Sequence, residues 1–321
     1  RGHVVGQIVN PAGAAHFGRK RGASNVTPWS KNWFGWMFRL TPRAIPEQMK
    51  RPTLLALAVA GALVPTLLTA LPATATPVKD SAPVAPTALP PWHPSRLARQ
   101  VGAARQVIVV TTDNSDGNQW GTSYATLRRY EKTARGWQQV GAATQARIGY
   151  NGFTRAYHRH QGSGETPAGS FSITQAFGRP AATVKMRYLR TDGDDFWPYD
   201  PNDPSTYNVL QTNRSPVARW RNDGNWSERF LDYGTQYYLG AVINFNIPRG
   251  IYRNAATGQN ETRTPADTSK GGGIFLHVWN GGATAGCVAV SLPQIKQILR
   301  WVDASKGTRI VMGPASALST V

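Results

Sequence analysis

Short apolar and β-branched runs, separated by glycine and polar turns, recur along residues 105–314 and constrain the fold most strongly. Such runs favour strands, because branched side chains pack well on a pleated surface. Residues 292–306 are the exception: proline stands near their start, apolar residues recur at helical spacing, and Gly307 follows. A segment of this length can bury one substantial core. The sequence therefore predicts a mainly β, single domain with one C-terminal helix and long loops.

The strands expected within this domain share alternating or β-branched composition and are bounded by turn residues. Two polar, proline-punctuated segments, 192–208 and 219–229, are predicted to be long loops. The predicted strands are 106–112, 124–130, 136–140, 147–150, 170–174, 237–246, 274–279, 288–291 and 308–312.

The first hundred residues have a different organisation. Residues 49–75 have a basic start, an apolar centre and a small-x-small end, which predicts a secretory signal peptide. A transmembrane anchor is the alternative, but Pro65 interrupts the apolar run. Residues 1–48 show no periodicity and are interpreted as a disordered, over-extended gene start, with a cytoplasmic extension as the alternative. Residues 76–104 are rich in proline and alanine and predict a linker.

The remaining boundaries follow from these segments. Residues 105–314 form the expected folded domain, and residues 315–321 are expected to be a tail.

The charge of the chain points to an anionic neighbour. It carries 36 Lys and Arg against 17 Asp and Glu, a net charge of +19, and without residues 1–75 the net charge is still +11. Nucleic acid, an anionic membrane and an anionic cell wall all satisfy such an excess. The basic residues are dispersed, and no nucleic-acid-binding signature is present. We therefore expect no nucleic-acid partner, and no stable membrane anchor once the signal peptide is removed.

Cys287 is the only cysteine of the chain, so it cannot form an internal disulfide. It follows Gly286, and His277 lies ten positions upstream in an apolar run. A thiol near an imidazole can be a nucleophile with its base. If the two segments pair as a hairpin, His277 would lie beside Cys287 and lower the pKa of the thiol. Backbone N–H groups near Gly286 could hold an oxyanion. The alternatives are a structural buried cysteine and a strand histidine satisfied by a carbonyl.

Other residues that could bind a metal or a substrate are better explained by ordinary structural roles. His158 and His160 share a strand face but lack a third ligand, so exposed strand residues are preferred. Five aspartates between positions 192 and 203 fit a solvated turn better than a calcium site. We predict no metal site. Trp279, Trp197 and Tyr207 are candidates for lining a substrate cleft, with core packing as the default for aromatic residues.

Three blocks of the sequence together resemble the L,D-transpeptidase (YkuD-type) family. They are Thr-Pro-Ala-Gly-Ser-Phe at 166–171, Ile-Phe-Leu-His at 274–277 and Thr-Ala-Gly-Cys-Val at 284–288, and they occur in the family's order. The resemblance covers about residues 105–314. It implies a β-rich catalytic domain, an active-site cysteine, peptidoglycan stem peptides as substrate, sensitivity to carbapenems and no cofactor.

The mechanism that the resemblance implies is acyl transfer through a Cys287 thioester, giving cross-links between two third-position residues of stem peptides. His277 would assist proton transfer, and N–H groups near Gly286 and Cys287 would hold the oxyanion. The protein would be secreted to the cell wall, where its basic excess fits anionic wall polymers. The alternatives are an L,D-carboxypeptidase on the same scaffold and a non-catalytic wall-binding protein.

The sequence departs from the family pattern at three points. Ala285 stands where a second histidine is common, Ala289 stands where Asn or Arg is common, and the interval between His277 and Cys287 is short. The two alanines remove polar support from the pocket and favour the non-catalytic alternative. Thr284 matches the family's Ser or Thr, and either orients the imidazole or serves as a turn hydroxyl.

Overall fold

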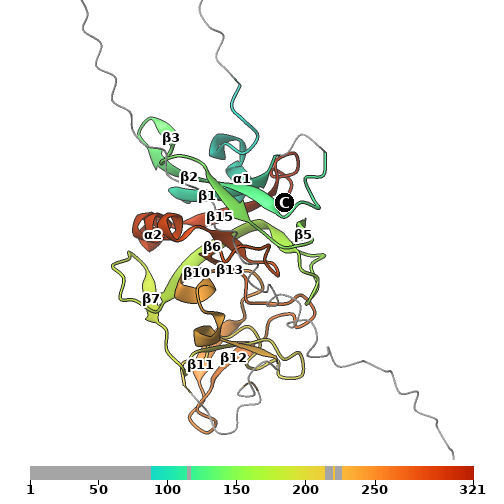
Figure 1. Cartoon of the computed structure of the whole chain (residues 1–321), viewed down its shortest axis with the longest axis vertical. Helices are drawn as coiled ribbons and strands as arrows, with labels where there is room; N and C mark the ends of the chain where they lie inside the picture. The colour runs from blue at the N-terminus through green and yellow to red at the C-terminus, as the bar shows by residue number, and fades with distance from the viewer. Residues whose placement is uncertain (1–87, 114–116, 214–219, 221–225) are drawn as a thin grey trace, which may run out of the picture. The chain divides into compact units, whose positions relative to one another are not determined.

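The computed structural model describes residues 88–113, 117–213, 220 and 226–321, which build a β-rich unit (Figure 1). The predicted upstream extension and signal peptide lie outside the described residues. None of the described helices is long and apolar enough to cross a membrane. The strands are β1 (Gln106–Thr112), β2 (Tyr124–Thr133), β3 (Gly136–Gln139), β4 (Thr144–Arg147), β5 (Phe153–Arg155), β6 (Thr166–Gly178), β7 (Arg187–Arg190), β8 (Phe196–Pro198), β9 (Ser227–Arg229), β10 (Leu239–Ile243), β11 (Arg249–Arg253), β12 (Asn260–Thr264), β13 (Phe275–Val278), β14 (Val288–Val290) and β15 (Arg309–Pro314).

One large sheet organises the unit and closes on itself. Its order is β1-β15-β6-β10-β13-β14-β4-β2-β3, and β1 also pairs with β2, so the path returns to its start and resembles a barrel. β5 and β7 pair with β6 outside this path. The interior is filled by aliphatic side chains from alternate positions of the strands, as the period of two demands. The predicted mainly β fold is confirmed.

The helix α2 (Leu292–Trp301) confirms the predicted C-terminal helix and ends five residues earlier than the pattern indicated. Pro293 stands in its first turn, where a missing N–H costs nothing. Ile295, Ile298 and Leu299 form its buried stripe and join the interior cluster of the sheet. A separate short turn, η6 (Ala304–Lys306), follows and ends at Gly307 in the left-handed region.

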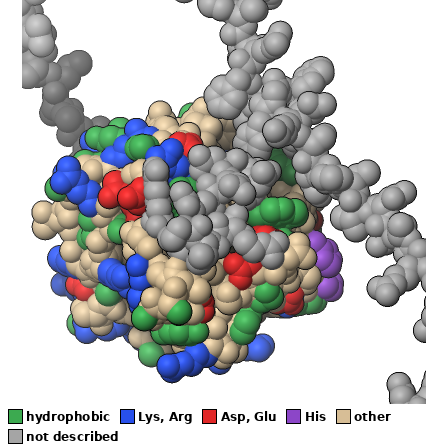
Figure 2. Space-filling view, turned by 90° about the horizontal axis from the view of Figure 1, so that it is seen from below, with side chains coloured by type: hydrophobic (Ala, Val, Ile, Leu, Met, Phe, Trp, Pro, Cys, Tyr) green, Lys and Arg blue, Asp and Glu red, His purple; other side chains and the backbone are tan. Residues whose placement is uncertain are grey.

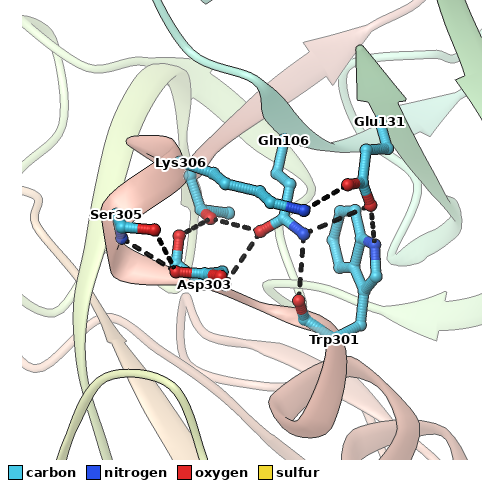
Figure 3. Close-up of polar contacts among 7 residues, drawn as sticks. Gln106, Glu131, Trp301, Asp303, Ser305 and Lys306 are labelled. Carbon is cyan, nitrogen blue, oxygen red and sulfur yellow. Dashed lines mark hydrogen bonds and ion pairs between the residues drawn. The ribbon is translucent and has the colours of Figure 1, made fainter. Parts of the chain in front are cut away.

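A polar cluster holds the end of α2 against β1 and β2, and we call it the Gln106 network (Figure 3). Gln106 donates to the Trp301 carbonyl at 3.0 Å and accepts from the Asp303 amide at 2.8 Å. Glu131 accepts from the Trp301 indole at 2.9 Å and pairs with Lys306. Each of these side chains has a partner, so the cluster fixes this end of the helix without leaving a buried group unsatisfied. Its members are Gln106, Glu131, Trp301, Asp303, Ser305 and Lys306.

The segment predicted as a linker is partly folded. Within it, η2 (Pro94–Arg96) and α1 (Ala98–Val101) form short helical turns. Leu97 and Val101 are buried against β1 and β15 in a second apolar cluster, which also takes in Leu318 from the segment predicted as a tail. Folded structure therefore extends beyond both ends of the predicted domain, because apolar residues in these polar segments have a sheet face to cover.

The predicted long loops carry structure that the sequence did not show. β8 lies in the first predicted loop and pairs with β9, which lies in the second. Outside these loops, β11 pairs with β12, and two turns, η4 (Phe230–Tyr233) and η5 (Gln236–Tyr238), precede β10, so the strand predicted at 237–246 begins two residues later than expected. Aromatic side chains from this segment pack on β13 and form a third apolar cluster. We call residues 191–238 the covering segment. Its cluster consists of Phe177, Trp197, Phe230, Tyr237, Val242, Phe275 and Cys287.

The surface carries its positive charge in a dispersed form. Lys and Arg side chains are scattered over the face seen in Figure 2, interspersed with acidic and uncharged groups. This agrees with the dispersed basic residues of the sequence, and no basic stripe is visible on that face.

Candidate active site

Cys287 lies immediately before β14, at the end of a turn that only glycine can make. Gly286 has φ +137°, which side chains rarely adopt. A Cβ there would also lie 2.9 Å from Nη2 of Arg159 and 2.9 Å from the carbonyl oxygen of Glu165. The Gly-Cys pair is therefore fixed by backbone conformation and by the close approach of two other segments.

The predicted hairpin between His277 and Cys287 is wrong, because β13 and β14 run parallel. His277 is paired with Ala289. Two residues earlier along each strand, the amide of Phe275 donates a hydrogen bond to the sulfur of Cys287. Alternate residues share a face, so the imidazole and the thiol project from the same side of the sheet, about 7 Å apart along the strands. The two residues are brought together by a different topology from the one predicted.

The thiol of Cys287 is held as a neutral group in its resting state. Its sulfur accepts from the Phe275 amide at 3.3 Å and donates to the Gly273 carbonyl at 3.3 Å. Burial raises the pKa of the thiol to about 12, and the carboxyl of Glu228 adds to the rise. The expected lowering of the thiol pKa is therefore not found. In this geometry the thiol would ionise only if another group took its proton.

His277 is buried, and its ring is in the neutral form that can accept a proton. Its Nδ1 lies 2.9 Å from the carbonyl oxygen of Val278, which can only accept, so Nδ1 carries the hydrogen. Burial lowers the pKa of the imidazole to about 4, so the ring is neutral near pH 7. Nε2 makes no hydrogen bond to a described residue and keeps its lone pair. The carbonyl contact foreseen as a bland alternative thus fixes the tautomer that a base requires.

Thr284 shapes the turn and does not contact the imidazole. Its hydroxyl donates to the Cys287 carbonyl at 2.6 Å and accepts from the Gly286 amide at 3.1 Å. Its backbone is anchored to Ile148 and Tyr150. Of the two predicted roles, the turn hydroxyl is the one observed. The Gly286 amide, expected to face an oxyanion, is committed to this hydroxyl.

Arg159 is a site residue that sequence reasoning missed. It is buried between exposed His158 and His160, in the loop that follows β5, so these residues are not on a strand as expected. Its Nε donates to the Glu165 carbonyl at 2.9 Å and its Nη1 to the Lys270 carbonyl at 2.5 Å. Its Nη2 lies against Gly286. The signal in the sequence was one cation flanked by two histidines, which we had considered as a metal fragment.

Glu228 is the second group that the sequence did not indicate. It lies on β9 of the covering segment and accepts from the Tyr237 hydroxyl at 2.5 Å. Burial raises the pKa of its carboxyl to about 7. The Tyr237 ring in turn contacts the His277 ring edge-on, with centroids 5.7 Å apart. A carboxyl that titrates near neutrality therefore lies within electrostatic reach of the thiol.

The three predicted cleft aromatics lie in different environments. Trp197 and Tyr207 are buried, the first bonded to Asn208 and the second to Gln161, so neither offers a surface to a ligand. Trp279 is half exposed and borders a cavity of about 300 Å³ together with Ala289. Trp279 remains a candidate for substrate contact, whereas the other two stabilise the covering segment.

Metal ligation finds no support in the part of the chain that the structure describes. No group of three or more His, Cys, Asp or Glu side chains there could hold a metal ion. The aspartates of the covering segment make turn contacts instead: Asp195 accepts from the Asp192 amide, and Asp203 accepts from Ser205 and Thr206.

Comparison with known proteins identifies the family. The model of the L,D-transpeptidase catalytic domain (YkuD) matches residues 126–312, more than half of the chain. The chain therefore belongs to this family, as its three sequence blocks predicted, and its family-level role concerns peptidoglycan stem peptides. No curated protein and no solved structure matches the chain.

Proposed function

We propose that this protein is an L,D-transpeptidase that transfers a stem-peptide acyl group through Cys287. The observation that carries the proposal is the placement of Cys287 and His277 on one sheet face, with the imidazole held neutral and its Nε2 lone pair open. A neutral base beside a neutral thiol is the starting state for general-base activation of a nucleophile.

The first half of the reaction forms the thioester. The Sγ–H proton of Cys287 passes to Nε2 of His277 while Sγ bonds to the carbonyl carbon between the L-centre of the diamino acid and the terminal D-Ala. The carbonyl π electrons move to oxygen and return as the C–N bond breaks. The imidazolium gives its proton to the departing D-Ala amine. The thioester and the free imidazole remain.

The second half releases the product. A side-chain amine of a neighbouring stem attacks the thioester carbonyl and loses a proton to His277, and the C–S bond breaks. Sγ regains the proton, and a cross-link between two third-position residues results. Water in place of the amine would give an L,D-carboxypeptidase. The reaction as proposed takes place at the cell wall after secretion, where the basic excess favours anionic polymers.

A non-catalytic wall-binding protein is the second candidate, and two observations favour it. The thiol is buried with a raised pKa, and Ala285 and Ala289 supply no polar group to the pocket. This candidate predicts a thiol that no acyl donor reaches.

Intact mass spectrometry after incubation with a carbapenem separates the candidates. The described domain should gain one adduct, and Cys287→Ala should gain none. Absence of an adduct across pH 6–10 would reject the enzyme in favour of the binding protein. With an adduct established, digestion of treated peptidoglycan distinguishes cross-linked dimers, expected here, from trimmed tripeptides, which would show the carboxypeptidase.

A further inference from the structure

Arg159 is a buried cation without a carboxylate partner. It is 4% exposed, and among the described residues no Asp or Glu lies within ion-pair distance of it. Two of its nitrogens donate to main-chain carbonyls, which carry only partial charge. Arginine keeps its proton even when buried, so a full positive charge is present. Burying such a charge without a counter-ion is costly, which calls for a functional reason.

The third nitrogen of the guanidinium indicates that reason. Nη2 makes no hydrogen bond to a described residue, and it lies 2.9 Å from the position that a Cβ of Gly286 would occupy. Gly286 precedes the nucleophile, so the charge is directed at the turn that presents Cys287. Burial lowers the pKa of Arg159, and Cys287 is the ionisable group that counteracts this most. Cys287, once ionised, is thus the group that interacts most strongly with the cation, ahead of Tyr207, Glu165 and Tyr150.

We infer that Arg159 is a positioning residue that stabilises the negative charge developed at Cys287, first on the thiolate sulfur and then on the oxyanion of the tetrahedral intermediate. The inference deepens the proposed function and rests on it for the oxyanion. When Sγ–H gives its proton to His277, one negative charge appears on sulfur; when Sγ bonds to the carbonyl carbon, that charge moves to oxygen. The cation acts on both without itself exchanging a proton.

Thiol alkylation tests the inference without any peptidoglycan substrate. Wild type, Arg159→Gln and Arg159→Lys are treated with iodoacetamide between pH 6 and 11, and adduct formation is followed by intact mass. We expect the Gln variant to show a thiol pKa raised by about one unit, and hence about tenfold slower alkylation at pH 8. The Lys variant, which retains the charge but lacks the planar group that donates to two carbonyls at once, should lie between the two.

The matched control is Arg309→Gln. Arg309 also donates to side-chain and main-chain oxygens, those of Ser170, but it lies on β15, which β6, β10 and β13 separate from β14 in the sheet order. Its loss should leave the alkylation profile unchanged. Near-UV circular dichroism confirms that each variant is folded.

The direction of the change decides the outcome. A merely structural Arg159 would, when replaced, loosen the pocket and expose the thiol, which would lower its pKa toward the ordinary value and speed alkylation. A thiol pKa that is lowered or unchanged in Arg159→Gln would overturn the inference. If that variant does not fold, Arg159→Met, an uncharged side chain of similar length, replaces it, and a lowered or unchanged thiol pKa there overturns the inference as well. A carbapenem-negative protein whose alkylation still depends on Arg159 would reject the proposed function and leave the electrostatic role standing.

Discussion

Two polar regions of this molecule are built on opposite principles. In the Gln106 network each side chain is paired, and the Lys306 hydrogen bond holds the pKa of Glu131 below its usual range. Around Cys287 the charges are not matched: Arg159 forms no ion pair with a carboxylate of the described residues, and burial raises the pKa of Glu228 to about 7. The first arrangement stabilises the fold. The second leaves buried ionisable groups with shifted pKa values, which is typical of functional sites.

This difference indicates that the Gln106 network should be tested for its effect on stability, and the surroundings of Cys287 for their effect on thiol reactivity. Substitutions in the Gln106 network should change the free energy of unfolding and leave thiol chemistry alone. Substitutions around Cys287 should change thiol chemistry, and some should even stabilise the protein, because an ill-satisfied buried group is removed.

The largest effect is expected for His277→Ala. Without Nε2 the thiol proton has no acceptor, so the rate of carbapenem acylation should fall by a factor of about 10²–10⁴. The measurement is the time course of adduct formation by intact mass. His160→Ala, an exposed histidine of the Arg159 loop, is the control and should acylate at the wild-type rate.

The same substitution has a signature in stability. The pKa of His277 is lowered to about 4, so the unfolded state binds a proton below pH 6.5 that the folded state does not. Wild-type stability should therefore be lost as pH falls from 6.5 toward 4, and His277→Ala should lack this component. Equal acid sensitivity of the two proteins in urea titrations would contradict the buried neutral imidazole.

An intermediate effect is expected for Glu228→Gln. The folded pKa of Glu228 is raised above its ordinary value of 4.5, so its contribution to wild-type stability is present below pH 4.5 and is lost as pH rises through about 7. The variant should be more stable than wild type by about 3 kcal/mol at pH 8, from a pKa change of 4.5 to about 7, and no more stable at pH 4. Urea unfolding at the two pH values measures this.

Glu228→Gln also removes a negative charge that raises the thiol pKa. Alkylation at pH 8 should become faster, opposite to the change expected for Arg159→Gln. A slower rate would show that Glu228 supports the nucleophile instead of opposing it.

The smallest effect is expected for Glu131→Gln. Its partner Lys306 is partly exposed, so solvent screens the ion pair, and the loss should be about 1 kcal/mol at pH 7. The pKa of Glu131 is lowered, so this contribution is present above its ordinary value of 4.5 and is lost as pH falls below it. Thiol alkylation should be unchanged. A change in alkylation would break the division between the two regions.

The fold was predictable where local pattern and tertiary role agree. The β-branched run at 106–112 and the apolar run at 308–312 became β1 and β15, and the apolar stripe of 292–302 became α2. The covering segment was not predictable as structure, because its short strands are held by aromatic packing on β13 and not by alternation of their own. The helical turns within the predicted linker were not predicted for a similar reason. Their few apolar residues are stabilised only by packing against β1, which the local sequence does not show.

For the site, the sequence could indicate which residues take part but not the relative direction of the strands that carry them. Cys287 and His277 were predicted, yet their pairing was inferred as a hairpin, since the spacing of ten residues does not reveal a parallel pair. Arg159 and Glu228 lie 128 and 59 positions before the cysteine, and no local pattern connects residues so distant. Their approach to the turn depends on where the chain returns after β5 and β9.

The sulfur rests between the Gly273 carbonyl and the Phe275 amide. This position affects how readily the thiol is oxidised. Peroxides and small disulfides attack thiolates far faster than thiols. If Cys287 is the proposed nucleophile, a thiol that stays protonated until a ligand arrives is protected from these oxidants, although the chain has no second cysteine to reduce it. Oxidative inactivation should fall mainly on molecules caught in mid-turnover, and idle ones should persist.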